Sequence, residues 1–360
     1  MNLSERDKTR YNRHLLLNEV GLCGQQKIKS SKVLVIGAGG LGCPSLLYLA
    51  AAGVGTIGII DFDKVEESNL QRQVLFETKD IGKNKATCAK QKLDSLNPLI
   101  NIIAYNFALS NKNALDLFTQ FDIIVDGTDN FTSRYIINDA CFLSKRPLIY
   151  GSIHKFEGQV SVFHFKNGPS YRCLFPTPPS PESTPSCSQA GVLGVLPGVI
   201  GSMQCNEALK IILGIGDVLS GRLSIYDSLN ASMTEFIIPK SNSSFQLSAE
   251  EFKTFDYKTY CTQTKNKINA ISLKKFNSLS KDAIILDVRE QWESPVLNAE
   301  RLIHIPLALL HVNISKIPKK KNVYVVCQKG IRSQKAITEL QKLGYKNLIN
   351  VEGGLLGNRS

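Results

Sequence analysis

Short apolar runs rich in β-branched residues recur through the first half of the chain, separated by stretches with helical spacing. Residues 33–36, 56–60, 121–126 and 147–150 each predict a buried strand. The small-residue stretch 43–52, which ends at a glycine, predicts a helix between the first two strands. Because strands alternate with helices, the pattern indicates an α/β fold with a Rossmann-like, doubly wound, mostly parallel sheet.

The rest of this first unit has weaker signals. Residues 1–30 are polar with helical spacing, and residues 191–213 form a second helical segment punctuated by glycines. The proline-rich residues 176–185 predict an exposed loop. We therefore expect one domain over residues 1–240.

A second α/β unit follows. Residues 283–287 and 323–326 predict buried strands, and residues 333–343 predict a helix. Residues 241–267 are rich in Lys, Ser, Asn and Thr, as is typical of a linker. We expect this linker to lead into a small α/β domain over residues 268–360.

Composition is that of an ordinary folded protein, with 43% hydrophobic and 21% charged residues among 360, which excludes a wholly disordered or fibrous chain. The formal net charge is +12, and residues 241–360 hold 19 Lys and Arg against 10 Asp and Glu. This excess suits a solvated surface, or the steering of an acidic partner. No zinc finger, RNA-recognition signature or aromatic–basic interleaving points to nucleic acid.

The nine cysteines are scattered and include no Cys-x-x-Cys pair, so we expect reduced thiols rather than a disulfide framework. The N-terminal residues lack the apolar core of a signal peptide, and no apolar stretch is long enough for a membrane span. These features predict a soluble, cytoplasmic protein without a membrane partner.

A glycine-rich turn follows the first predicted strand. Its sequence, Gly-Ala-Gly-Gly-Leu-Gly over residues 37–42, removes side chains where backbone N–H groups could approach phosphate at a helix N-terminus. Asp61 ends the second predicted strand, where a carboxylate can accept ribose hydroxyls. Taken alone, this unit would indicate an NAD-dependent oxidoreductase.

Three further residues favour a triphosphate site instead. Arg72 offers a guanidinium that can bind phosphate oxygens through two hydrogen bonds, and Lys85 offers a point charge. Asp129, in the loop after a predicted strand, is placed to hold Mg²⁺ near the α-phosphate. Taken singly, Lys85 suits a solvated surface and Asp129 suits a turn. Their order in one nucleotide-binding unit favours phosphate chemistry.

The sequence resembles the MoeB/ThiF family of ubiquitin-activating-enzyme-like adenylyltransferases. The matching stretches, which run in order from about residue 5 to residue 240, are RYNRH, GAGGLGCP, DFDKVEESNLQRQ, IGKNKA, DGTDNFTSRYIIND and AGVLGVLPGVIGSMQCNEALK. The resemblance implies adenylation, with ATP and Mg²⁺, of the C-terminal glycine of a small β-grasp protein ending in Gly-Gly. It also implies a homodimer, in which Arg13 reaches the ATP of the neighbouring subunit. The implied ATP-binding residues of the same chain are Gly40, Asp61, Asn69, Arg72, Lys85, Asp129 and Asn130.

The sequence departs from this family at its structural zinc. Many members hold the metal with two Cys-x-x-Cys pairs, but here only Cys173 remains of the first pair, and no cysteine occupies the second region near residues 240–245. One thiolate cannot complete a tetrahedral site, so we predict no structural zinc. Cys187, which precedes a predicted helix, resembles the cysteine that links covalently to the carrier in sulfur-transferring relatives. The alternative for Cys187 is a small core residue.

Cys327 ends a buried predicted strand and begins the loop Cys-Gln-Lys-Gly-Ile-Arg-Ser. Successive backbone N–H groups form an anion-binding nest in such loops, and Lys329 and Arg332 add positive charge around Gly330, which favours a thiolate. The stretch resembles a rhodanese domain, with supporting matches in LDVRE, HIPL and VEGG. The resemblance covers roughly residues 268–360 and implies that Cys327 carries a persulfide.

Together the two resemblances predict an enzyme that adenylates a sulfur carrier and then converts it to a thiocarboxylate. The implied catalytic residues are Arg72, Asp129, Cys187 and Cys327. The sulfur donor would be a protein such as a cysteine desulfurase, and the carrier of molybdopterin synthase is the favoured substrate. Alternatives are a carrier for thiamine synthesis or tRNA thiolation, a non-catalytic carrier-binding scaffold, and an oxidoreductase.

Overall fold

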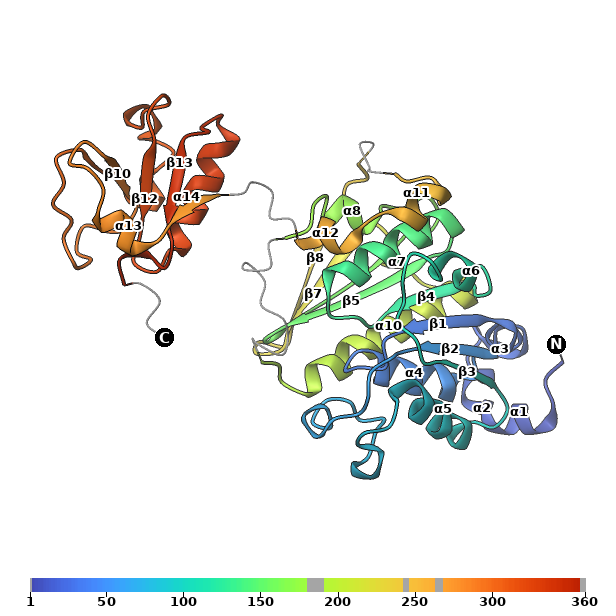
Figure 1. Ribbon diagram of the computed structural model, residues 1–360. Coiled ribbons are helices and arrows are strands. Elements are labelled where there is room, and N and C mark those ends of the chain that lie inside the picture. Colours follow the sequence, from blue (N-terminus) through green and yellow to red (C-terminus); the bar gives the residue numbers. More distant parts are fainter. Residues whose placement is uncertain (1, 180–190, 242–245, 263–267, 357–360) are drawn as a thin grey trace. The chain divides into compact units, whose positions relative to one another are not determined.

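The computed structural model describes residues 2–179, 191–241, 246–262 and 268–356, and the chain divides into two compact units, Met1–Gln263 and Thr264–Ser360 (Figure 1). Each unit is built around its own sheet and its own hydrophobic core. None of the described helices is long and apolar enough to cross a membrane.

The first unit contains an eight-stranded sheet in the order β3-β2-β1-β4-β5-β6-β7-β8. The first five strands in this order are parallel, which confirms the predicted doubly wound arrangement. The last three strands extend it with antiparallel pairs, which the sequence patterns did not predict. The strands are β1 Lys32–Ile36, β2 Thr56–Ile60, β3 Asn101–Tyr105, β4 Ile123–Asp126, β5 Leu148–His154, β6 Glu157–Phe163, β7 Arg222–Asp227 and β8 Ser232–Ile237.

Helices cover both faces of this sheet (Figure 1). Alternation along β1 explains the two layers: Val33 and Val35 enter one core, and Leu34 and Ile36 enter the other. The first core includes α3 Gly21–Ser30, α4 Gly42–Ala52, α5 Lys85–Leu96 and α10 Val195–Leu213. The second includes α6 Ala114–Phe118, α7 Phe131–Ser144, α8 Tyr171–Leu174, α11 Ala249–Thr254 and α12 Tyr257–Thr262. The short α1 Glu5–Arg10 and α2 Asn12–Leu15 precede α3, and η1 Glu67–Asn69 and η2 Thr78–Asp80 precede α5.

The predicted linker over residues 241–267 differs from the structure. Its described residues 249–262 include α11 and α12, which pack against α7 as part of the first unit. The physical reason is that Phe252, Tyr257 and Cys261 are apolar side chains buried in the second core. The predicted loop 176–185 lies outside the described residues from residue 180 onward.

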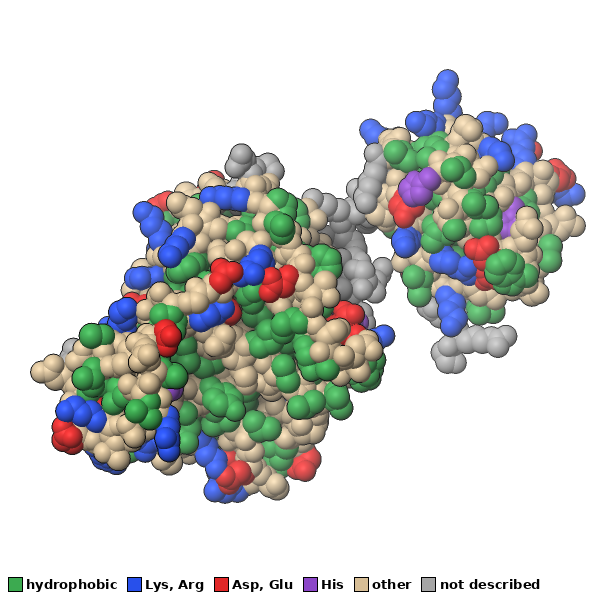
Figure 2. Space-filling model, turned by 180° about the vertical axis from the view of Figure 1, so that it is seen from behind, with side chains coloured by type: hydrophobic (Ala, Val, Ile, Leu, Met, Phe, Trp, Pro, Cys, Tyr) green, Lys and Arg blue, Asp and Glu red, His purple; other side chains and the backbone are tan. Residues whose placement is uncertain are grey.

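The second unit contains a five-stranded, fully parallel sheet in the order β11-β10-β12-β13-β9. The amphipathic helix α14 Ile331–Lys342 packs on β12 and β13, and Phe276 of α13 lies in a separate apolar cluster. Lys and Arg side chains are spread over the surface of this unit (Figure 2). Its elements are β9 Asn269–Ile271, α13 Leu273–Asn277, β10 Ile284–Asp287, β11 Leu302–His304, η3 Leu307–Leu309, η4 Ile314–Lys316, β12 Val323–Val326, α14, β13 Leu348–Val351 and η5 Gly354–Leu356.

Candidate functional site

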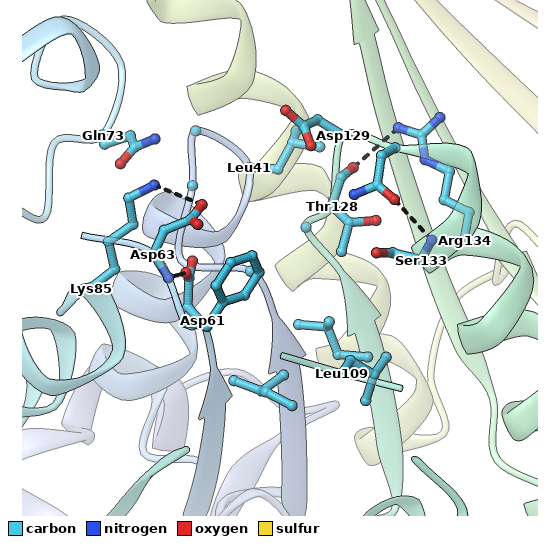
Figure 3. Close-up of a pocket in the computed structure, with 18 of the residues that line it drawn as sticks. Leu41, Asp61, Asp63, Gln73, Lys85, Leu109, Thr128, Asp129, Ser133 and Arg134 are labelled. Atoms are coloured by element: carbon cyan, nitrogen blue, oxygen red, sulfur yellow. Dashed lines mark hydrogen bonds and ion pairs between the residues drawn. The ribbon is translucent and has the colours of Figure 1, made fainter. Parts of the chain in front are cut away.

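A pocket lies where the strand order of the first sheet reverses, between β1 and its neighbours β2 and β4 (Figure 3). The carboxyl ends of these three strands deliver the glycine turn, Asp61 and the loop 127–130, so chemistry from distant parts of the chain meets there. The pocket has a volume of about 190 Å³. Of the predicted residues, it brings together Gly40, Asp61, Arg72, Lys85, Asp129 and Asn130.

The glycine turn depends on close backbone contacts. Gly37 has a φ of +90°, and a Cβ added there would lie 2.9 Å from the carbonyl oxygen of Gly127. A Cβ on Gly42 would lie 1.8 Å from the carbonyl oxygen of Gly37. Gly42 begins α4, so the turn brings backbone directly to a helix N-terminus that faces the pocket.

Asp61 accepts two backbone hydrogen bonds, from the N–H of Ala38 at 2.8 Å and from the N–H of Asp63 at 2.9 Å. Burial raises the pKa of its carboxyl group, and these two bonds together with the charge of Lys85 offset part of that rise. Asp61 therefore ties the glycine turn to the end of β2 while it lines the pocket.

Lys85 is buried at the start of α5, rather than solvated as its residue type alone would suggest. Its Nζ lies 3.4 Å from Oδ2 of Asp63, whose side chain is about half exposed. Arg72, which also lines the pocket, donates from Nη1 to the carbonyl oxygen of Ser68 at 3.1 Å. Both cations line the cavity, where they can meet the oxygens of a triphosphate.

Asp129 and Asn130 follow β4. Asn130 caps α7 by accepting the N–H of Ser133 at 2.9 Å, so its side-chain oxygen already has a structural partner. Asp129 is exposed at the pocket, and among the described contacts its carboxylate has no hydrogen bond or ion pair. That carboxylate is free to bind a cation.

Two predicted ATP-binding residues do not line this pocket. Asn69 is buried, and its Oδ1 accepts the N–H of Glu66 at 3.3 Å, so the side chain holds the short helix η1. Arg13 is exposed on α2 and is also not among the residues that line the cavity. Cys187 lies outside the described residues.

The structure adds residues that motif reasoning did not assign. Gln73 and Arg134 both line the pocket and are at most 8% exposed. Arg134 donates from Nη2 to the carbonyl oxygen of Thr128 at 3.1 Å. A signal was available, since Arg134 follows Asn130 by four residues at the start of a helix and so returns to the same face.

Cys173 lies beside Ser241, so the two regions compared above with the cysteine pairs of a zinc site are in contact. Its Sγ accepts the N–H groups of Ser170 and Ser241, each at 3.4 Å. Partial burial raises the pKa of the thiol, but the Ser170 hydroxyl at 3.5 Å and these two N–H groups outweigh that effect, so the pKa is lowered. In the described part of the chain, no group of three or more His, Cys, Asp or Glu residues could hold a metal ion. The absence of structural zinc stays a prediction, which a metal assay on purified protein would test.

The second candidate site is the loop around Cys327, between β12 and α14. Cys327 is 1% exposed, and its Sγ accepts the N–H of Gly330 at 3.1 Å and that of Ser333 at 3.4 Å. Gly330 has a φ of +82°, and a Cβ there would approach the backbone of Gly353. The loop therefore forms a nest of N–H donors around one sulfur atom.

The charged residues of this loop are held differently from one another. Arg332 makes two hydrogen bonds to the carboxylate of Glu293, at 2.6 and 2.5 Å, and this pairing lowers the pKa of Glu293 to about 2. Lys329 is exposed. The segment that carries Glu293 also carries Trp292, which is 80% exposed, and Ser294, whose carbonyl accepts from Gln328. The positive charge predicted around Cys327 is therefore partly offset, because Arg332 is paired with the carboxylate of Glu293.

Comparison with known proteins gives a family match for each of the two units. The ThiF family matches residues 11–247, and the rhodanese-like domain matches residues 272–357. The probable adenylyltransferase/sulfurtransferase MoeZ of Mycobacterium tuberculosis is 40% identical over 370 aligned positions, covering 98% of this chain and 93% of that protein. The adenylyltransferase and sulfurtransferase MOCS3 of Aedes aegypti is 38% identical, covering 95% and 83%.

A shorter relative covers the first unit. The sulfur carrier protein adenylyltransferase of Thermus thermophilus is 48% identical over 246 positions, which span 67% of this chain and 91% of that protein. Among solved structures, E. coli MccB with ATP has a TM-score of 0.57 at 23% identity, covering 65% of this chain and 72% of that one, and this likeness supports the fold. The chain therefore belongs to the ThiF family, carries a C-terminal rhodanese-like domain, and is an enzyme of the adenylyltransferase and sulfurtransferase class.

Proposed function

We propose that this enzyme uses ATP to adenylate the C-terminal glycine of a small β-grasp sulfur carrier and then converts it to a thiocarboxylate. The observation that carries the proposal is the meeting of the glycine turn, Asp61, Arg72, Lys85 and Asp129 in one pocket. The nest around Cys327 in the same chain supports the sulfur-transfer half.

In the adenylation step, a carboxylate oxygen of the carrier attacks the α-phosphorus of ATP, a new P–O bond forms, and pyrophosphate leaves. Little covalent work falls to the protein, so alignment and charge neutralisation dominate. Arg72 and Lys85 supply positive charge, and the N-terminus of α4 offers backbone N–H groups to phosphate. Asp61, which is 9% exposed at the end of β2, suits the ribose hydroxyls.

The pocket also suits a divalent cation. Asp129 presents an exposed carboxylate with no partner among the described residues, and Mg²⁺ prefers to bind through one or two carboxylates together with substrate phosphates. When bound there, Mg²⁺ would neutralise charge on the α-phosphate region. Asp129 would hold it from the end of β4.

In the second step, the terminal sulfur of a Cys327 persulfide attacks the acyl carbon, and AMP leaves with the bonding electron pair. The product is an acyl persulfide on Cys327. Attack of the Cys187 thiolate on Sγ of Cys327 then expels the carrier thiocarboxylate and leaves a Cys187–Cys327 disulfide, which a cellular dithiol must reduce. The persulfide itself would come from a donor such as a cysteine desulfurase.

The decisive experiment is ATP–pyrophosphate exchange by the purified enzyme with a panel of small carriers that end in Gly-Gly. Exchange with one carrier alone would establish adenylation and would separate molybdopterin, thiamine and tRNA-thiolation carriers. Folded protein that supports no exchange with any carrier would favour a binding scaffold. Binding of NAD in preference to ATP would favour an oxidoreductase.

Cys327→Ala should abolish thiocarboxylate formation, measured by mass spectrometry of the carrier, because the persulfide has no other attachment site in this scheme. Adenylation should be unchanged, since the nucleotide pocket belongs to the other unit. Loss of pyrophosphate exchange in this variant would contradict the division of labour between the units.

We also propose that the enzyme is a homodimer. An exposed apolar hollow lies over α4 and α10, where Tyr48, Val74 and Val195 are each more than half exposed. Arg72 lines both this hollow and the nucleotide pocket, so a partner seated there would approach the nucleotide. Such a partner could bring in Arg13, which does not line the pocket of its own chain.

A further inference from the structure

The loop between β4 and α7 is held more firmly than its length suggests. Gly127 donates its N–H to the carbonyl oxygen of Ile36 at 2.8 Å, and a Cβ on Gly127 would lie 2.9 Å from the carbonyl oxygen of Gly37. Asn130 caps α7 at the far end. The loop is therefore fixed against the glycine turn on one side and against a helix on the other.

Thr128, in the middle of this loop, is bound through each of its polar groups. Its N–H and its hydroxyl both donate to Oδ1 of Asp126, at 2.9 and 2.7 Å, and its carbonyl oxygen accepts from Nη2 of Arg134 at 3.1 Å. Asp126 is 1% exposed and Arg134 is 8% exposed. A residue whose N–H, hydroxyl and carbonyl groups are all bound to buried charged side chains has little freedom to move.

The two buried charges support each other. Burial raises the pKa of the Asp126 carboxyl, and the charge of Arg134 together with the bonds from Thr128 offsets part of that rise. Arg134 is further surrounded by the rings of Tyr150 and Phe131, with its guanidinium carbon 5.3 and 5.9 Å from their centroids. Gln204 of α10 binds the carbonyl oxygen of Asp126 at 2.7 Å.

Asp129 directly follows Thr128, and its contacts differ from those of its neighbours. Its carboxylate lines the pocket without a hydrogen bond or ion pair among the residues that the structure describes. We propose that Asp126, Thr128 and Arg134 are positioning residues that set the loop so that the Asp129 carboxylate is presented to the nucleotide's metal ion in advance. The inference rests on the proposed function, because it requires a Mg²⁺–ATP site.

The test is calorimetric titration of the full-length protein with a non-hydrolysable ATP analogue, in Mg²⁺ and in EDTA. The ratio of the two affinities isolates the contribution of the metal. Thr128→Val keeps the shape of the side chain but removes its hydroxyl bond to Asp126, so we expect this ratio to fall about tenfold. Affinity in EDTA should not change. Thr128→Ser restores a hydroxyl and should restore the ratio.

Asp129→Asn provides the matched background. If Thr128 acts through Asp129, Thr128→Val should lower the ratio no further once the carboxylate is gone. An additional loss in the double variant would overturn the proposal, and so would a fall in EDTA affinity, which would show direct contact with nucleotide. An unchanged ratio in Thr128→Val would overturn it as well.

A second variant covers the case in which Thr128→Val fails to fold. Arg134→Lys keeps the buried positive charge near Asp126 but loses the guanidinium geometry at the carbonyl of Thr128. We expect the same selective loss of the metal contribution, with thermal unfolding recorded alongside. If the unaltered protein binds no nucleotide in either buffer, the proposed function fails and this inference fails with it. If it gains affinity with Mg²⁺ but neither variant alters that gain, only this inference fails.

Discussion

Lys85 is a buried cation that forms an ion pair with Asp63, whose side chain is about half exposed. Asp63 is therefore free to give way when a triphosphate competes for the ammonium group. We predict that Lys85→Met slows ATP–pyrophosphate exchange about a hundredfold, because a donor to developing negative charge contributes on this scale in buried sites. The methionine keeps the apolar stem packed.

The matched control for Lys85 is Lys83→Met. Lys83 lies two residues earlier, and its side chain is 56% exposed beside Asp80. The Lys83→Met variant should catalyse ATP–pyrophosphate exchange at the rate of the unaltered enzyme. Exchange by Lys85→Met within about threefold of the unaltered enzyme would contradict a role at phosphate, since loss of such a donor should cost far more.

Glu293 gives the Cys327 loop a distinct pH dependence. The pKa of its carboxyl falls from 4.5 to about 2 because Arg332 binds the charged form. A lowered folded-state pKa means that the ion pair stabilises the second unit above about pH 4.5 and that this contribution is lost as the pH falls toward 2. Glu293→Gln should therefore lower the melting temperature of this unit at pH 6, and the difference should shrink between pH 5 and pH 3.

Scanning calorimetry across this pH range would check the Glu293 prediction. Glu300→Gln is the control, because Glu300 is exposed in the same unit and has no ion pair among the described residues. A difference between Glu293→Gln and the unaltered protein that stayed constant with pH would show that the charge pair is not its source.

At the scale of elements, a buried polar network joins α12 and α8 to α7. Arg172 binds both oxygens of Asp139, at 2.8 and 2.7 Å, and the hydroxyl of Tyr257 donates to the same carboxylate at 2.6 Å. We predict that Tyr257→Phe lowers the free energy of unfolding of the first unit by about 1.5–3 kcal/mol, as expected for a hydrogen bond to a buried charge.

Urea unfolding followed by circular dichroism would measure the effect of Tyr257→Phe. Tyr226→Phe on β7 is the comparison, since no hydrogen bond of its hydroxyl is found among the described contacts. Equal stability of the two variants would mean that the Tyr257 hydrogen bond does not help to hold α12 on α7.

Short apolar runs rich in β-branched residues made β1, β2 and β4 predictable, and Gly37 and Asp61 marked the ends of two of them. The strands β3, β6, β7 and β8 were not predicted. For β8 the reason is that every residue of this edge strand is exposed, so no hydrophobic face reveals it. The segment of α11 and α12 looked like a linker because its few apolar residues are outnumbered by polar ones. Only tertiary contact shows that Phe252 and Tyr257 are buried.

The candidate site divides in the same way. Residues that carry charge into the pocket, such as Arg72 and Lys85, could be chosen from motifs and spacing. For Asn69 the sequence leaves two roles open, because a side-chain amide can bind a ligand or accept a backbone N–H. Its Oδ1 accepts from Glu66 in the structure, and its contact with ATP stays a prediction. The hydrogen bonds that hold Thr128 could not be predicted from the sequence, for a different reason. They depend on which backbone atoms Asp126 and Arg134 reach after folding.

At the scale of the whole molecule, a homodimer with Arg13 acting across subunits makes a sharp prediction. Arg13→Ala and Lys85→Ala should each be nearly inactive in pyrophosphate exchange. A mixed dimer of the two would contain one site with both residues intact and one with neither. Random mixing should therefore recover about a quarter of full activity, because half of the dimers are mixed and one of their two sites works.

Mixing after mild dissociation, with the dimer fraction followed by analytical ultracentrifugation, would carry out this test. Each variant mixed with itself serves as the control. Dimers that form without any recovery of exchange would place Arg13 outside the catalytic machinery. If the chains remain monomeric at high concentration, the proposal that the apolar hollow is a dimer interface is wrong.

Trp292 is the sole tryptophan of the chain, and it lies beside Glu293, which binds Arg332 of the loop around Cys327. The first unit therefore contributes no indole emission. Fluorescence excited at the red edge of protein absorption therefore arises in the second unit alone, from the residue that precedes Glu293. If Cys327 carries the persulfide as proposed, we expect this single indole to report sulfur loading and discharge in real time, without a label.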